Sequence, residues 1–537
     1  MTPIFRLCDE HITRTAALDP VGAVYMGLTG DFGAATDYSP DGFAARAGLL
    51  ADTLSRLAAL EPENDRDRKA AAHLRERLEA EAAWHELGEH YTDVRGPFGL
   101  VNGVRDSIDL LPRAGDDQWR EVAAHLAAIP QMLTGWRATL EEGSARGLVS
   151  ARRQASEAAV AADAYVGTHD ALLAEYGEGP VKGDLTKAVA QAHEAYAQTA
   201  RYLREDYAPR GTEHDGVGAE RYAVAARLML GADLDPVDAY AWGWEELARI
   251  EAEMVREAAA ILPGASVDEV IEHLDATHYV DGPDAYLAWL KEQHERAVAE
   301  LNGVHFDIPE PLRSVDVTLA HGSTAGAPYY TAPSEDLSRP GRTWWPLGGR
   351  DRFATWSELT TVFHEGVPGH HLQLGAVAVA GDKLSRFAKF SWVGGHGEGW
   401  ALYAERLADE LGWHSDPATR LGMLAGSALR AARVVIDIGV HLDLPLPDGS
   451  KWTFEKACAF LRERGRAEAH TVHAEIVRYF GWPAQAICYK LGERAWLEAR
   501  AEASRKPGFD LRRWHTAALD LGPIGLATMR EALTDLA

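Results

Sequence analysis

Apolar residues recur at intervals of three and four along most of residues 41–300, and Ala, Glu, Arg and Leu fill many of the positions between them. This periodicity predicts amphipathic helices, which the intervening residue types also favour. Asp-Pro and Pro-Asp pairs resemble helix starts, and Pro-Gly pairs resemble helix ends. The clearest helices in this part of the chain are expected at residues 150–176, 184–207, 235–262 and 284–301.

The pattern changes at residues 314–349, where aromatic and β-branched residues alternate with Gly and Pro. This residue pattern predicts a small β-sheet. Helical periodicity then returns at residues 355–380, 396–413, 416–442, 453–465, 467–482 and 483–504. The pattern as a whole predicts a mostly α protein with an N-terminal helical lobe (1–310) and a catalytic helical lobe (311–537) that contains the sheet. A single continuous domain is the alternative.

Composition narrows the functional classes. The chain has 537 residues and 46% hydrophobic content, enough for a large globular core. Its 54 basic and 81 acidic residues give a formal charge of -27, which disfavours nucleic-acid and membrane binding. There is no apolar leader-like segment, and three cysteines cannot form a disulfide framework. We therefore expect a cytoplasmic protein, and leave a homodimer open.

The most informative stretch is His364-Glu365-Gly366-Val367-Pro368-Gly369-His370-His371, which Gly397-Glu398-Gly399 follows after a spacer. Two imidazoles and a carboxylate form a common ligand set for catalytic zinc, which leaves a coordination position open. We expect His364, His370 and Glu398 to bind one Zn²⁺ ion, with other divalent metals as alternatives. Glu365 is the expected general base. A helix-capping role is the competing interpretation of Glu398.

The spacing of the histidines leaves the second ligand open. Two histidines four residues apart share a helix face, but His370 lies six residues after His364 (370 − 364), about 240° round a regular helix. It can join His364 only if Pro368-Gly369 distorts the helix. His371 returns to the His364 face but lies about 10.5 Å along the axis. We prefer His370 as the ligand, with His371 as the alternate or as a substrate contact.

Other polar residues are candidates for substrate binding. Tyr489 is a candidate for stabilising an oxyanion, and Arg478 for binding a substrate carboxylate. Tyr330 is a candidate for lining a peptide groove, next to an edge strand that could pair with an extended peptide. Tyr489 and Tyr330 could equally be structural, as core aromatic side chains.

Three strings carry a resemblance to a known family: His364-Glu365-x-x-Pro368-Gly369-His370-His371-Leu372-Gln373, Glu398-Gly399-Trp400-Ala401-x-Tyr403-x-Glu405 and Arg478-Tyr479-x-x-x-Pro483-x-Gln485-Ala486-x-x-Tyr489-x-x-Gly492. Most of the chain, and residues 329–492 most strongly, resembles the DUF885 family of bacterial proteins, which is similar in fold to the zinc metallopeptidase families M32 (the carboxypeptidase Taq type) and M3. This resemblance implies a two-lobed helical body with the active site in a deep central groove, and activity on small peptides, as in a carboxypeptidase. The two extra residues between the histidines depart from the peptidase motif.

The leading hypothesis is a zinc-dependent peptidase or amidase that hydrolyses small peptides. Two histidines and a carboxylate also describe non-haem iron sites, so an iron enzyme is one alternative. A peptide-binding protein without catalytic activity is another, and a helical scaffold without metal is a third.

Overall fold

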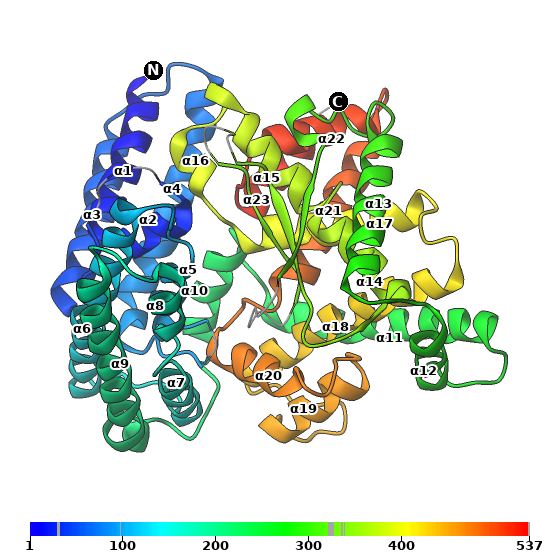
Figure 1. The fold of residues 1–537 in the computed structure, drawn as a ribbon. Helices are drawn as coiled ribbons and strands as arrows, with labels where there is room; N and C mark the ends of the chain where they lie inside the picture. Colours follow the sequence, from blue (N-terminus) through cyan, green and yellow to red (C-terminus); the bar gives the residue numbers. More distant parts are fainter. Residues whose placement is uncertain are drawn as a thin grey trace. The chain divides into compact units, whose positions relative to one another are not determined.

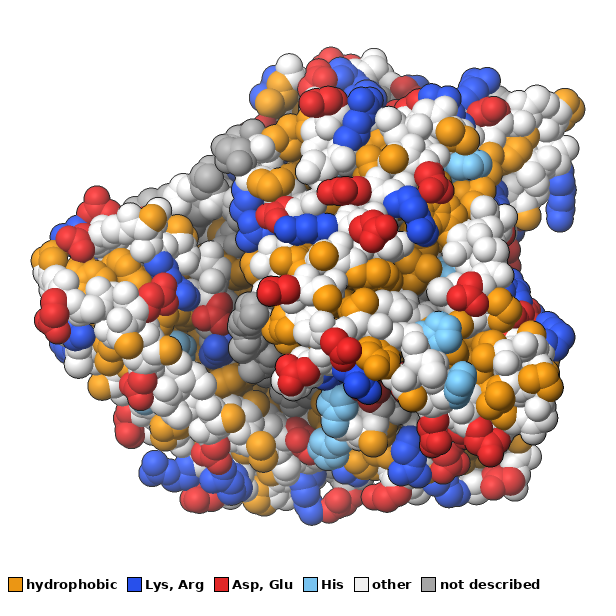
Figure 2. All heavy atoms as spheres, turned by 45° about the vertical axis from the view of Figure 1, so that its right-hand side comes forward, with side chains coloured by type: hydrophobic (Ala, Val, Ile, Leu, Met, Phe, Trp, Pro, Cys, Tyr) orange, Lys and Arg blue, Asp and Glu red, His pale blue; other side chains and the backbone are white. Residues whose placement is uncertain are grey.

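The computed structural model describes residues 1–28, 30, 33–96, 98–320, 327–334, 337 and 339–534. Most of them lie in helices, and the strands are short (Figure 1). Within these ranges, none of the helices is long and apolar enough to cross a membrane. Acidic and basic side chains are interspersed over the face seen in Figure 2. The predicted mostly α fold is confirmed.

The chain divides into two compact units. The first comprises Met1–Val224 and His473–Pro483, and the second comprises Ala225–Val472 and Ala484–Ala537. The boundary between lobes that we expect at residue 310 lies inside the second unit. The physical reason is that α11 (Pro236–Ile261) packs along α18 (Pro417–His441), so these helices from the two halves of the sequence share one core.

The first unit is built from helices that pack through small and aromatic side chains. Its longest helix, α6 (Asp116–Ala145), packs against α9 (Lys182–Tyr202), and their contact buries Trp136 and Tyr196. The remaining helices are α1 (Pro3–Leu18), α2 (Pro20–Met26), α3 (Pro40–Ala58), α4 (Asp65–Glu86), α5 (Leu100–Asp109), α7 (Arg152–Ala164), α8 (Asp170–Tyr176), α10 (Ala219–Leu230), which continues into the second unit, and α20 (Val472–Gly481).

The second unit contains the predicted metal ligands. Its central helices are α14 (Thr355–Glu365), α15 (His370–Val379) and α17 (Gly394–Glu410), and α18 packs against α14. The other helices of the unit are α12 (Val267–Thr277), α13 (Pro283–Leu301), α16 (Arg386–Phe390), α19 (Phe454–Glu463), α21 (Cys488–Ser504), α22 (Leu511–Asp520) and α23 (Leu526–Thr534).

Two small sheets precede α14. In one, β4 (Arg342–Pro346) lies between β2 (Asp316–Ala320), to which it is parallel, and β3 (Tyr329–Thr331), to which it is antiparallel. In the other, β1 (Tyr279–Asp281) pairs with β5 (Arg352–Ala354). Phe353 and Trp345 pack in one cluster with Val362 of α14, so the sheets orient the helix that carries His364. Positions 321–326, 335, 336 and 338 of the predicted sheet region lie outside the described residues.

Most helices predicted from periodicity are confirmed to within a few residues, and the exceptions have local causes. The helix predicted at 150–176 is wrong as a single element, because α7 ends at Ala164 and α8 begins at Asp170. Gly167, between them, has a φ of 95°, which a continuing helix does not permit. The helix predicted at 184–207 ends in a π-helical turn at Leu203–Tyr207.

Candidate metal centre

The first feature of the site is an interruption of the helix at Gly366–Gly369. α14 ends at Glu365 and α15 begins at His370, so the distortion predicted at Pro368-Gly369 is a complete break. The amide of Gly369 donates to the carbonyl of Phe363 at 3.0 Å, which folds the chain back onto the end of α14. A Cβ at residue 369 would lie 2.0 Å from the carbonyl oxygen of His364, so only glycine fits.

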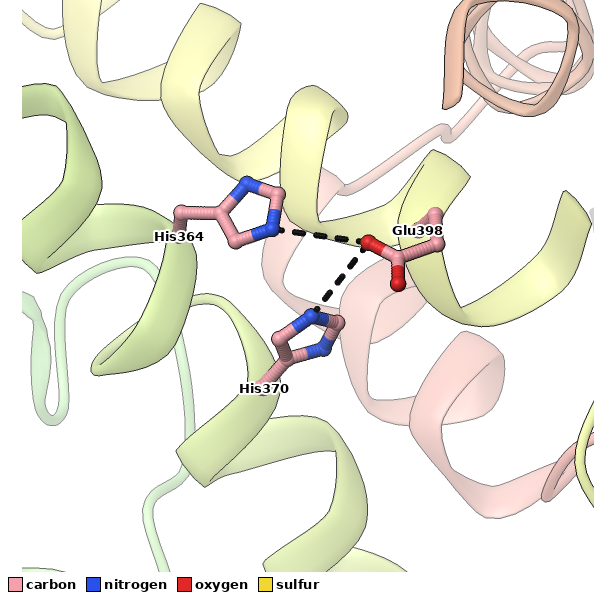
Figure 3. Close-up of side chains that lie close together, drawn as sticks. All are labelled: His364, His370 and Glu398. Atoms are coloured by element: carbon pink, nitrogen blue, oxygen red, sulfur yellow. Dashed lines mark ion pairs between the residues drawn. The ribbon is translucent and has the colours of Figure 1, made fainter. Parts of the chain in front are cut away.

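This break brings His370 to His364. Nε2 of His364 lies 3.5 Å from Oε2 of Glu398, and Nε2 of His370 lies 3.6 Å from the same oxygen (Figure 3). One ligand atom from each residue lies within 4.8 Å of the other two. The histidines are buried, and the Glu398 side chain is 18% exposed. The predicted trio therefore converges, with its carboxylate on the solvent side.

His371 points elsewhere. Its Nε2 donates to the carbonyl of Leu312 at 2.9 Å, and its Nδ1 is 3.2 Å from the hydroxyl of Tyr330. Because a carbonyl oxygen can only accept, Nε2 carries the proton and the Tyr330 hydroxyl donates to Nδ1. Both ring nitrogens of His371 are thus engaged, and the structure places His370, not His371, beside His364 and Glu398.

Glu405 supports the first ligand, although we assign it no role from the sequence. Nδ1 of His364 donates to Oε1 of Glu405 at 2.7 Å, and Thr360 donates to Oε2 of Glu405 at 2.5 Å. This contact orients the imidazole so that its Nε2 faces Glu398, as carboxylate partners of metal-binding histidines do. The sequence contained a signal for this position of Glu405, because Glu398 and Glu405 are seven residues apart (405 − 398) and therefore share one face of α17.

We predict that Glu405→Gln lowers zinc affinity by about 10–100-fold, because an amide is a weaker acceptor and stabilises the imidazole less. Competition with a chromophoric chelator measures this affinity. Thr360→Val, which removes only the outer hydrogen bond, is the matched control and should have a smaller effect. Unchanged affinity in Glu405→Gln would show that Glu405 only fills space.

Electrostatics in the trio are dominated by charge pairing inside a buried site. Burial opposes protonation of His364, but hydrogen bonds to Glu398 and Glu405 outweigh it and raise the pKa of His364 to about 10. Burial likewise acts against ionisation of Glu398, yet the two histidines hold its pKa well below the ordinary range. The carboxylates of Glu398 and Glu405 therefore place negative charge beside the His364 imidazole, where a bound cation would take the place of its proton.

Glu365 has a free carboxylate oxygen at the edge of the trio. Its side chain is buried, its Oε1 is 4.0 Å from Nε2 of His364, and its Oε2 has no hydrogen-bond partner among the described residues. Burial raises the pKa of Glu365, and the nearby charges of His364, His370 and Arg430 offset part of this effect. A buried carboxylate oxygen without a hydrogen-bond partner is costly for folding, so its presence beside the trio points to a chemical role.

α17 is held in place by contacts that explain the Gly-rich motif around Glu398. The indole of Trp400 donates to the carbonyl of Pro368 at 2.8 Å, which ties α17 to the helix break. A Cβ at Gly399 would lie 2.5 Å from Cα of Gly492, so glycines allow α17 and α21 to cross closely. The Gln373 side chain of α15 also donates to His396 at 3.1 Å. Glu398 is thereby fixed relative to both histidines.

The other candidates have the following positions. Tyr330 lies on the edge strand β3 and binds His371, so it supports α15.

Tyr489 is half-buried in the first turn of α21, with the Arg433 guanidinium 4.9 Å from its ring centre. Its neighbour Cys488 lies near Glu398, whose charge adds to the effect of burial in raising the pKa of the thiol. The Arg478 guanidinium pairs with Glu475 at 2.8 Å and belongs to the first compact unit.

The fold and the site define a mostly helical protein with a buried His-His-Glu group. The chain belongs to the DUF885 family, described as bacterial proteins of unknown function, which matches residues 20–533. A search of curated proteins found no significant match.

Two solved structures share the fold over nearly their whole length. The putative lipoprotein from Colwellia psychrerythraea is 21% identical with a TM-score of 0.87, and the match covers 99% of this chain and 98% of that chain. A putative lipoprotein of unknown function from Shewanella oneidensis is 17% identical with a TM-score of 0.79, and the match covers 100% of both chains. At these identities the comparison establishes the fold.

Proposed function

We propose that this protein is a zinc-dependent hydrolase that cleaves amide bonds in small peptides. The observation that carries the proposal is the convergence of His364, His370 and Glu398 beside the unpaired carboxylate oxygen of Glu365. Two imidazole nitrogens and one carboxylate oxygen are the donors of many catalytic zinc sites. The donor set of the chain therefore fits zinc, with other divalent metals as substitutes.

When bound, the metal supplies Lewis-acid activation of a carbonyl group and of water. The residues of the chain do the rest of the chemistry. Glu365 accepts a proton from the attacking water at its free oxygen and later donates a proton to the leaving amine. Its raised pKa suits both steps, because a carboxyl group that is too acidic would not return the proton. Glu405 holds the His364 ring throughout.

The choice of a peptide as substrate rests on the motif resemblance to the carboxypeptidase Taq type of metallopeptidase. Gly369-His370-x-Leu372 matches part of its metal-binding motif, and that resemblance implies exopeptidase action. In this proposal Tyr489 donates to the oxyanion formed from the scissile carbonyl.

The test is elemental analysis of the purified protein together with a peptide-library assay before and after treatment with a chelator. We expect about one zinc per chain, turnover of short peptides, and loss of turnover on chelation that zinc restores. Bound iron with oxygen-dependent turnover would favour the non-haem iron alternative. A metal-free protein with full activity would overturn the proposal.

We also propose that the protein acts in the cytoplasm on small peptides, without a nucleic-acid or membrane partner, and leave homodimer formation as a further hypothesis. The support is the strongly acidic composition and the low cysteine content, three in 537 residues. Cell fractionation tests the location, and recovery with the membrane fraction, as for a lipoprotein, would contradict it.

A further inference from the structure

Trp392 is a large apolar side chain at the edge of the metal centre, and 48% of it is exposed. It lies in the short segment between α16 and α17, and its ring centre is 6.0 Å from that of His370. The next residue, Val393, is buried, so the backbone here is anchored while the indole is left open on one side.

The position of the indole depends on a glycine next to a metal ligand. A Cβ at Gly397 would lie 2.2 Å from Cη2 of Trp392, so any side chain at residue 397 would push the indole away. Gly397 directly precedes Glu398. The indole thus lies close to His370 of α15 and to Gly397 of α17, while about half of Trp392 is exposed to solvent.

We propose that Trp392 is the specificity-determining residue of this site, and that its exposed surface binds an apolar or aromatic side chain next to the scissile bond. This inference rests on the proposed function. Consecutive Cα atoms are about 3.8 Å apart, so a side chain flanking a carbonyl at the ligand trio reaches an indole this close to His370. An apolar group covering the indole gains contact area that water otherwise occupies.

The surroundings of the indole favour an apolar partner at this position. The small cavity beside Trp392 is lined mainly by apolar and aromatic side chains, including Leu374, Val377 and Trp496. The surroundings of the indole are therefore apolar.

The test uses two zinc-chelating probes, acetohydroxamate and 3-phenylpropanohydroxamate, whose dissociation constants are measured by calorimetry with the zinc-loaded full chain. We expect wild type to prefer the phenyl probe by about tenfold or more. Trp392→Ala should abolish most of this preference without changing acetohydroxamate binding or zinc content, and Trp392→Phe should retain it. Val255→Ala, which trims another exposed apolar side chain of the same unit, is the control.

The outcomes separate this inference from the proposed function. An unchanged phenyl preference in Trp392→Ala, with zinc bound, overturns the inference alone. Equal weakening of both probes also overturns it, because Trp392 would then only support the fold. Wild type that binds neither zinc nor hydroxamate overturns the proposed function and this inference with it. In Trp392→Ala, kcat/KM for peptides with Phe or Leu at the cleavage site should fall more than kcat/KM for peptides with Gly there.

Discussion

Glu365→Gln is expected to reduce peptide turnover by about 10²–10⁴-fold while leaving the zinc content unchanged. Glutamine has nearly the same shape as glutamate but cannot accept and return a proton. Because Oε2 of Glu365 has no partner among the described residues, the substitution removes no hydrogen bond at that atom and should not destabilise the fold. Steady-state kinetics on the best library peptide, with elemental analysis of the same sample, measure both effects.

Glu358→Gln is the matched control for this experiment. Glu358 is also a carboxylate of α14 and is only 12% exposed, but its partner is Arg350, 3.5 Å away, rather than the ligand trio. We expect its turnover to stay within a few-fold of wild type, with a modest loss of stability. If Glu365→Gln were fully active, Glu365 would not be the base, and a binding function without catalysis would gain support.

His370→Ala is expected to weaken zinc binding by about a hundredfold to a thousandfold, whereas His371→Ala should retain it. This expectation comes from dividing the binding free energy of a structural zinc site, roughly 10–16 kcal/mol, among its ligands. The contrast follows from geometry, because Nε2 of His370 faces Glu398, while His371 is engaged by Leu312 and Tyr330. Competition titrations with a chromophoric chelator measure the affinity.

His371→Ala has its own expected cost, which makes the comparison decisive. Removing its two hydrogen bonds leaves the Leu312 carbonyl and the Tyr330 hydroxyl without a partner, so unfolding should require about 1–3 kcal/mol less free energy. Thermal unfolding of both variants separates this loss from loss of metal. Zinc binding that depended on His371 and not on His370 would contradict the arrangement described above.

Periodicity and turn chemistry were enough to predict most of the helices, and the His-Glu motif indicated three side chains that the structure brings together. The interruption at Pro368-Gly369 was predictable because proline and glycine act on their own backbone, whatever surrounds them. Histidine and glutamate are candidate ligands in the sequence because zinc binds only a few kinds of side chain. The break at Gly167 was missed because an apolar repeat can continue through a turn, so that the sequence pattern hides it.

Tertiary structure decided how these residues combine. Whether His370 or His371 joins His364 depends on how α15 leaves the break, and on the Leu312 carbonyl and Tyr330 hydroxyl that hold His371. The contact between Glu405 and His364, and the place of Trp392 over Gly397, arise where separate elements pack together. Hydrophobic spacing specifies which face of a helix is buried, but not which distant helix it meets, and it is that second choice that assembles the site.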